Sequence, residues 1–120
     1  MKTLLIATML GLSTVVIGQT KAFYTAVEQQ DIASITNLLS DEVELCIKDD
    51  QQFMSKTDAT NSIKNFLAKV GPKSIAPLHS GSSGAGSKYK VAKMQSNGGV
   101  YRIFIYMENN KIQEVRFDTF

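Results

Sequence analysis

The C-terminal part of the chain carries the clearest run of strand-forming residues. Residues 99–119 contain two stretches rich in Val, Ile, Tyr and Phe, separated by Asn109-Asn110. β-branched and aromatic residues favour strands, and Asn tolerates the positive φ angles of a type I′ turn. The pattern therefore predicts a hairpin at Asn109-Asn110, and Asn97-Gly98 predicts a second turn of this kind just before it. Together the two turns predict a meander of at least three antiparallel strands.

A two-residue turn also predicts which residues lie opposite each other in this hairpin. The expected pairs are Met107 with Ile112, Ile105 with Glu114, Ile103 with Arg116 and Tyr101 with Asp118. In this register Glu114 and Arg116 share a strand face with Ile112, while Tyr106 lies on the other face. The two charges could pair with each other or line a cavity above the sheet. In an edge strand a solvated pair would be the ordinary case, whereas in a central strand the pair would need an explanation.

Helical spacing of apolar residues marks two regions before this sheet. Residues 22–39 predict two short helices, with Asp31 as the cap of the second. Tyr24 belongs to the first helix, where it is interpreted as an amphipathic boundary residue, the alternative being that it points into a cavity. Ser55 with Asp58 resembles a capping box and predicts a third helix. That helix should end near Val70, because Gly71-Pro72 follows.

Three further strands are predicted outside the C-terminal hairpin. VELCIKD, residues 43–49, alternates so that Val43, Leu45 and Ile47 share one face and Cys46 lies on the other. Residues 74–83 form a strand in which Pro77 favours an edge position or a bulge. SKYKVAKM, residues 87–94, forms the next strand. The predicted order is helices, one strand, a helix and four strands, which is an α+β fold.

The N-terminus has the pattern of a secretory leader. Lys2 is followed by an uncharged, mostly apolar run from Leu4 to Ile17, which is too short to cross a bilayer. We expect residues 1–18 to be a signal peptide cleaved after Gly18, or alternatively after Ala22, with residues 19–120 as a single domain. No membrane span is expected after cleavage, and the product is expected to be secreted or periplasmic.

Charge and cysteine content exclude several classes of protein. The formal net charge is +2 for the whole chain, and it falls to +1 without Lys2. A charge so close to zero does not predict nucleic-acid binding. Cys46 is the only cysteine, so a disulfide within the chain is impossible. Because no histidine is near it in sequence, we interpret Cys46 as structural.

Candidate chemistry in the predicted sheet is sparse. His79 is the only histidine and could act as a base or a hydrogen-bond anchor, although a structural role is the commoner one for a single histidine on a strand. The Gly-rich residues 81–88 superficially resemble a phosphate-binding loop. However, the order Gly-Ser-Lys and the strand that follows do not match that motif, so we interpret the segment as a hairpin connection. No metal or cofactor is predicted.

Several segments resemble one known family. They are His79-Ser-Gly81, Gly86-Ser-Lys-Tyr89, Tyr101 to Tyr106 and Gln113 to Phe117, with further similarity back through residues 43–49 and the helix from Ser55. The chain resembles small secreted bacterial proteins grouped as domain of unknown function 4783, which are similar to the nuclear transport factor two-like, cystatin-like superfamily. The resemblance implies helices packed in a strongly curved antiparallel sheet, a cone with a cavity. It implies no established activity and no catalytic residues.

The function expected from these features is binding without catalysis. The ligand would be a small apolar or amphipathic molecule, or a protein partner, held by the cavity or the outer face of the sheet. The alternative is a small isomerase-like or hydrolase-like enzyme that uses acid/base chemistry in the cavity. Its candidate polar residues are His79 or Glu114 as base, and Arg116 or Tyr106 as stabiliser. A homodimer through the outer sheet face is a third hypothesis.

Overall fold

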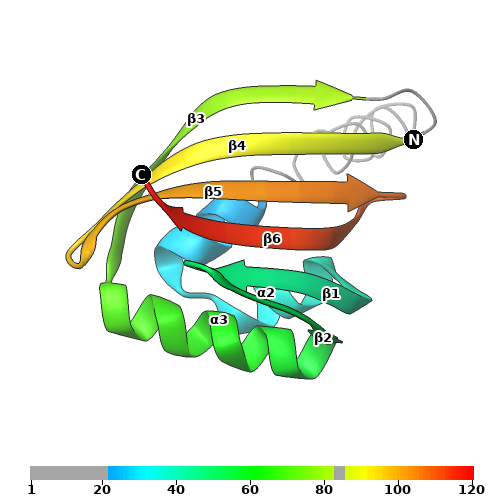
Figure 1. Ribbon diagram of the computed structural model, residues 1–120, viewed down its shortest axis with the longest axis horizontal. Helices are drawn as coiled ribbons and strands as arrows, with labels where there is room; N and C mark the ends of the chain where they lie inside the picture. The colour runs from blue at the N-terminus through cyan, green and yellow to red at the C-terminus, as the bar shows by residue number, and fades with distance from the viewer. Residues whose placement is uncertain (1–21, 83–85) are drawn as a thin grey trace, which may run out of the picture.

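A computed structural model describes residues 22–82 and 86–120, and within them one six-stranded sheet curves around the helices (Figure 1). The strand order is β2-β1-β6-β5-β4-β3, and β1 and β6 pair in parallel while the other neighbours are antiparallel. The strands are β1 (Leu39–Ile47), β2 (Asp50–Ser55), β3 (Pro72–Ser82), β4 (Ser87–Ser96), β5 (Gly99–Glu108) and β6 (Lys111–Thr119). The predicted leader, residues 1–18, and residues 83–85 of the predicted hairpin connection lie outside the described residues.

The helices form where the capping residues predict them. Residues 22–29 are helical, and α2 (Ile32–Leu38) follows with Asp31 as its N-cap, whose Oδ1 accepts a hydrogen bond from the N–H of Ser34 at 3.3 Å. The longer α3 (Lys56–Val70) begins after Ser55, whose hydroxyl oxygen accepts from the N–H of Asp58. Gly71 ends α3 in the left-handed conformation with φ of 65°.

The core lies between the helices and one face of the sheet. Phe66 of α3 packs against Phe117 of β6 and Tyr101 of β5, with ring centroids 5.0 and 5.2 Å apart. Phe23 and Val27 from the helical residues 22–29 are fully buried in the same cluster. We call this helix-covered side of the sheet the inner face and the opposite side the outer face. The arrangement confirms the predicted α+β fold with helices on a curved sheet.

The C-terminal hairpin forms as predicted, but its register differs. Asn109 and Asn110 have φ angles of 50° and 67°, which confirms the turn. Met107 pairs with Ile112 as expected, but a bulge leaves Gln113 unpaired, and Tyr106 then pairs with Glu114. The predicted pairs of Ile105 with Glu114, Ile103 with Arg116 and Tyr101 with Asp118 are therefore wrong. The observed partners of these three β5 residues are Val115, Phe117 and Thr119, respectively.

The N-terminal strands also differ from the prediction. Leu39 begins β1 instead of ending a helix, and β2 was not predicted. The turn between β1 and β2 includes Lys48 at a φ of 51°, and the Lys48 N–H donates to the carbonyl of Phe117 at 2.7 Å. β2 is exposed along most of its length because it pairs only with β1, so its polar sequence carries no alternation.

The other predicted turn and strands lie at the expected positions. Asn97-Gly98 connects β4 to β5, although the positive φ angle of this connection is at Gly99 and not at the two turn residues. The N–H groups of Asn97 and Gly98 donate to the carbonyls of Gly71 and Val70, so the end of α3 holds this turn. β3 is an edge strand with a bulge between Pro77 and His79, as Pro77 predicts.

Candidate functional site: a pocket between the first helix and the sheet edge

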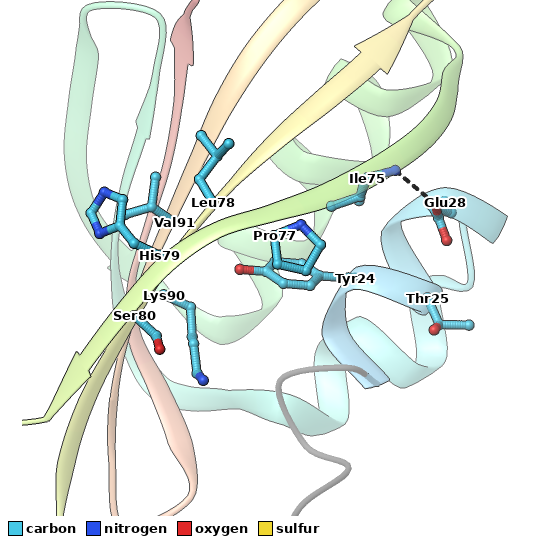
Figure 2. A pocket seen from close by; sticks show the side chains of 10 residues that line it. All are labelled: Tyr24, Thr25, Glu28, Ile75, Pro77, Leu78, His79, Ser80, Lys90 and Val91. Atoms are coloured by element: carbon cyan, nitrogen blue, oxygen red, sulfur yellow. Dashed lines mark hydrogen bonds between the residues drawn. The ribbon is translucent and has the colours of Figure 1, made fainter.

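A pocket of about 600 Å³ lies where the helical residues 22–29 approach the β3 edge of the sheet (Figure 2). The residues that line it are Tyr24, Thr25, Glu28, Ile75, Pro77, Leu78, His79, Ser80, Lys90 and Val91. Its size falls in the range of small-molecule sites, and apolar side chains make most of its wall. It is therefore the candidate site among the described residues.

The bulge in β3 decides which side chains face this pocket. Pro77 pairs with Ala92 and His79 pairs with Val91, so the extra residue, Leu78, reverses the alternation of faces. Ala92 is fully buried against the core, which places Pro77 on the inner face. Figure 2 shows Ser80 and Lys90 on the same side of β3 as Tyr24, whereas His79, Leu78 and Val91 extend on the other side.

Tyr24 carries the most unusual polar atom in the pocket wall. The residue is 8% exposed, and its hydroxyl oxygen is buried without a hydrogen-bond partner. Burial raises the pKa of Tyr24 to about 12, so the phenol keeps its proton at neutral pH. The boundary position that the sequence favoured is wrong, and the alternative of a cavity-facing tyrosine describes the residue better. The helical spacing of apolar residues cannot distinguish a boundary tyrosine from a cavity-facing one. The difference depends on β3, which forms the opposite wall of the pocket.

Glu28 ties the helix to the sheet edge at the same pocket. Its carboxylate oxygen Oε2 accepts a hydrogen bond of 2.8 Å from the backbone N–H of Ile75 in β3 (Figure 2). β3 is an edge strand, so this N–H has no strand partner on that side. The bond therefore satisfies a backbone N–H group at the sheet edge and joins the helix to β3 beside the pocket.

Lys90 brings a positive charge to the inner face. It pairs with Ser80 on one side and with Ile105 on the other, and Ile105 is fully buried in the core. On the inner face, the line of register partners continues from Ile105 to Val115 of β6 and Leu45 of β1. Lys90 is the one charged residue in this line. Within the described part of the chain, no carboxylate lies within ion-pair distance of its ammonium group.

His79, predicted as a candidate, lies at the outer rim of the pocket. It is exposed, and its ring meets Tyr89 edge-on at 6.2 Å between centroids. Tyr89 in turn stacks on Phe104 at 6.1 Å. His79 thus belongs to an aromatic row on the outer face and does not point toward Tyr24.

Glu114, Arg116 and Tyr106 come together, but on the outer face. Glu114 Oε2 lies 3.7 Å from an Arg116 guanidinium nitrogen, and Tyr106 is the strand partner of Glu114. Burial raises the pKa of the Glu114 carboxyl, and nearby Glu44 adds to the rise while Arg116 opposes it. These three residues do not line the pocket, so the structure does not join them with Tyr24 or Lys90 in one site.

Cys46 lies on the outer face of β1, as the alternation predicts. It is 2% exposed and is the register partner of Arg116 in β6. Burial raises the pKa of its thiol, and the neighbouring Arg116 only partly offsets the rise. The thiol therefore stays protonated at neutral pH, which agrees with a structural role.

Two other features are absent from the described residues, a cluster of metal ligands and a membrane-spanning helix. Across 22–82 and 86–120, no three His, Cys, Asp or Glu side chains are grouped as ligands for a metal ion. No helix within the same ranges is long and apolar enough to cross a membrane.

Comparison with known proteins identifies the family. The family model described as Domain of unknown function (DUF4783) matches residues 20–118. The chain belongs to this family. No curated protein matches the DUF4783 chain significantly.

Solved structures agree with the family and the fold. A DUF4783 protein from Bacteroides uniformis has a TM-score of 0.77 at 18% identity, covering 83% of this chain and 95% of the other. One from Bacteroides ovatus has a TM-score of 0.76 at 18% identity, covering 82% and 93%. An NTF-2 like protein of unknown function from Burkholderia xenovorans has a TM-score of 0.66 at 11% identity, covering 87% and 83%. At these identities the likeness shows the fold alone, and this chain has a nuclear transport factor two-like fold.

Proposed function

We propose that this protein binds a small amphipathic molecule in the pocket beside Tyr24 and does not transform it. The observation that carries the proposal is the buried, unpartnered hydroxyl of Tyr24 in the wall of a cavity of about 600 Å³. A buried hydroxyl without a partner costs about 1–3 kcal/mol, and such groups are rare in folded proteins. An acceptor atom on a ligand would remove this cost.

The pocket wall suits a ligand with an apolar body and a polar end. Ile75, Pro77 and the ring of Tyr24 supply apolar surface, and Ser80 and Lys90 supply polar groups on the same side of β3. The Tyr24 hydroxyl is covered, so a ligand must shift the wall slightly to reach it. Among the described strands β3 is an edge strand that pairs only with β4, so this wall of the pocket is able to shift.

Binding without catalysis fits the placement of the titratable groups. The residues proposed for acid/base chemistry, Glu114 and Arg116, form an ion pair on the outer face. His79 extends away from Tyr24, and the carboxylate of Glu28 is already bound to the N–H of Ile75. General acid/base catalysis needs a titratable group within hydrogen-bond reach of the substrate, so we assign no reaction to the pocket.

The direct test is NMR titration of residues 19–120 with 1-octanol, a neutral amphiphile. We expect shifts confined to amides around Thr25, Ile75 and Lys90, with a Kd on the order of 0.1–1 mM for burial of the octyl chain. Thr25→Trp should abolish them by filling the pocket from its exposed side, and Gln29→Trp, one turn further along the helix, should not. Shifts that persist in Thr25→Trp, or an absence of shifts in the unmodified protein, would contradict the proposal.

A second prediction concerns the empty protein. Tyr24→Phe removes the unpartnered hydroxyl and keeps the ring, so it should raise the free energy of unfolding by about 1 kcal/mol. Urea denaturation measures this change, and Tyr106→Phe on the outer face is the control. A loss of stability in Tyr24→Phe would mean that the hydroxyl has a partner in the free protein, and it would remove the observation on which the proposal rests.

We further propose that residues 1–18 direct export, so that binding takes place in the periplasm or outside the cell. Intact mass spectrometry of the exported product is expected to show a chain that begins at Gln19. A full-length chain that stays in the cytoplasm would contradict this proposal and would leave the pocket unaffected.

A further inference from the structure

We infer that the ligand of this pocket carries a negatively charged head group, a carboxylate on an apolar tail, and that Lys90 pairs with it. The inference rests on the proposed binding function and adds the chemical class of the ligand. It depends on the balance of charge and hydrogen-bond groups among the residues that line the pocket.

Lys90 is a charged residue at an inner-face position of β4. A lysine on a strand of a sheet that is covered on one side is ordinarily found on the solvated face. Lys93 and Arg102, which are register partners in β4 and β5, lie on the outer face in this way. Lys90 instead follows the inner-face register, next to the buried Ile105 and on the same side of β3 as Tyr24. Its ammonium group has no carboxylate partner within the described residues. A half-buried cation without a partner attracts an anion.

The carboxylate in the pocket wall already accepts a hydrogen bond. Glu28 is the one carboxylate among the lining residues, and its Oε2 accepts the N–H of Ile75 at 2.8 Å. If Glu28 turned to pair with Lys90, the Ile75 N–H at the sheet edge would lose its partner. The described structure therefore leaves the charge of Lys90 available for a ligand.

The remaining polar groups of the pocket point to the same class of ligand. Burial raises the pKa of Tyr24 to about 12, so its phenol is protonated at neutral pH, and its hydroxyl has no hydrogen-bond partner. Thr25 and Ser80 also line the pocket and bring hydroxyl groups to it. A carboxylate accepts hydrogen bonds through both oxygens and so matches a site with one cation and several hydroxyl donors. A cationic head group would meet Lys90 with like charge.

The experiment compares octanoate with 1-octanol, which have the same chain length and differ in head-group charge. At pH 7.5 and low salt we expect the unmodified protein to bind octanoate about tenfold more tightly than 1-octanol, the ratio that corresponds to 1.4 kcal/mol. Isothermal calorimetry or the NMR titration above gives both Kd values. The ratio should fall as salt is added, because ions screen a partly exposed pair.

Variants of Lys90 isolate its role. Lys90→Gln should reduce the octanoate-to-octanol ratio to about one without weakening 1-octanol, and Lys90→Arg should keep most of the preference. Lys88→Gln is the matched control, since Lys88 lies two residues away on the same face of β4 but does not line the pocket. An unchanged ratio in Lys90→Gln, or equal loss in Lys88→Gln, would overturn the assignment of Lys90.

The two proposals fail in different ways. If 1-octanol and octanoate bind the unmodified protein equally well in the pocket, the anionic preference is wrong while the binding function stands. If neither compound binds, the proposed function itself fails. Preferential binding of octyltrimethylammonium, a cation of similar length, would overturn the charge assignment directly.

Discussion

The two halves of the sheet follow the same alternation of side chains but end in different environments. In the half formed by β1 and β6, the inner-face residues Leu45, Val115 and Phe117 are 0–2% exposed, because they lie in the core on which α3 packs. In β3, which forms the other edge, no residue is buried to that degree. Among the described residues, the helical residues 22–29 face this edge across the pocket.

This difference shows that the covering helices, and not the strands, decide where the sheet forms a core and where it forms a cavity. Lys90 and Phe117 both occupy inner-face positions, yet one is half exposed and the other is completely buried. Close packing maximises stability in the β1 and β6 half. The β3 edge is packed less closely, and beside it the Tyr24 hydroxyl and the Lys90 ammonium have no hydrogen-bond or ion-pair partner among the described residues.

The largest expected effect tests the packed half. Phe117→Ala removes a fully buried ring that contacts Phe66, so it should lower the free energy of unfolding by about 3–5 kcal/mol. The same truncation at Leu78, which is 46% exposed beside the pocket, should cost less than about 1 kcal/mol. Chemical denaturation of both variants measures the contrast. Equal losses would mean that the two halves are packed alike.

An intermediate effect is expected from the hydrogen bond between Glu28 and the edge of β3. Glu28→Ala removes the acceptor of the Ile75 N–H at the edge of β3, and we expect a loss of about 1–3 kcal/mol. Hydrogen exchange should accelerate at the Ile75 amide more than at amides of β5 or β6. Gln29→Ala changes an exposed neighbour on the same helix and serves as the control. Unchanged protection of Ile75 would show that Glu28 does not hold the edge.

The smallest effect concerns the outer face of the packed half. Burial raises the pKa of Glu114 in the folded state, so its contribution to stability is fully present below the unfolded pKa of about 4.3 and is lost as pH rises through the folded value. Glu114→Gln does not ionise and should gain stability relative to the unmodified protein between pH 3.5 and pH 7. Thermal unfolding across this range measures the trend, with Glu108→Gln at an exposed site as control. The opposite trend would mean that the attraction of Arg116 outweighs burial.

Local patterns in the sequence predicted most of the elements. Asp31, Ser55 and Gly71 determine helix ends through short-range hydrogen bonds and backbone angles, and Asn109-Asn110 determines a turn in the same way. β2 was not predicted, because an edge strand that is exposed on both faces shows no alternation of hydrophobic and polar residues. Its strand conformation comes from pairing with β1, which is a tertiary interaction.

The candidate site was harder to predict than the fold. The expected place of Glu114 and Arg116 was wrong because a bulge at Gln113 shifts every later residue of β6 by one position. The apolar spacing did carry a signal, since Ile112 and Val115 are three residues apart while Val115 and Phe117 are two apart. No such signal marks Tyr24 or Lys90. Their site forms between segments about 65 residues apart, so only the folded chain brings it together.

The parallel pairing of β1 with β6 has a consequence for the order of folding. Glu44 and Glu114 are about 70 residues apart in sequence, yet they are register partners in the middle of the sheet. The central strand is therefore synthesised after all the others, and until it arrives β1 with β2 and the meander of β3, β4 and β5 have no shared neighbour. Contacts of such long range form slowly. We therefore expect the nascent chain to remain unfolded until β6 has been synthesised. An export channel that transports unfolded chains could accept the protein in this state.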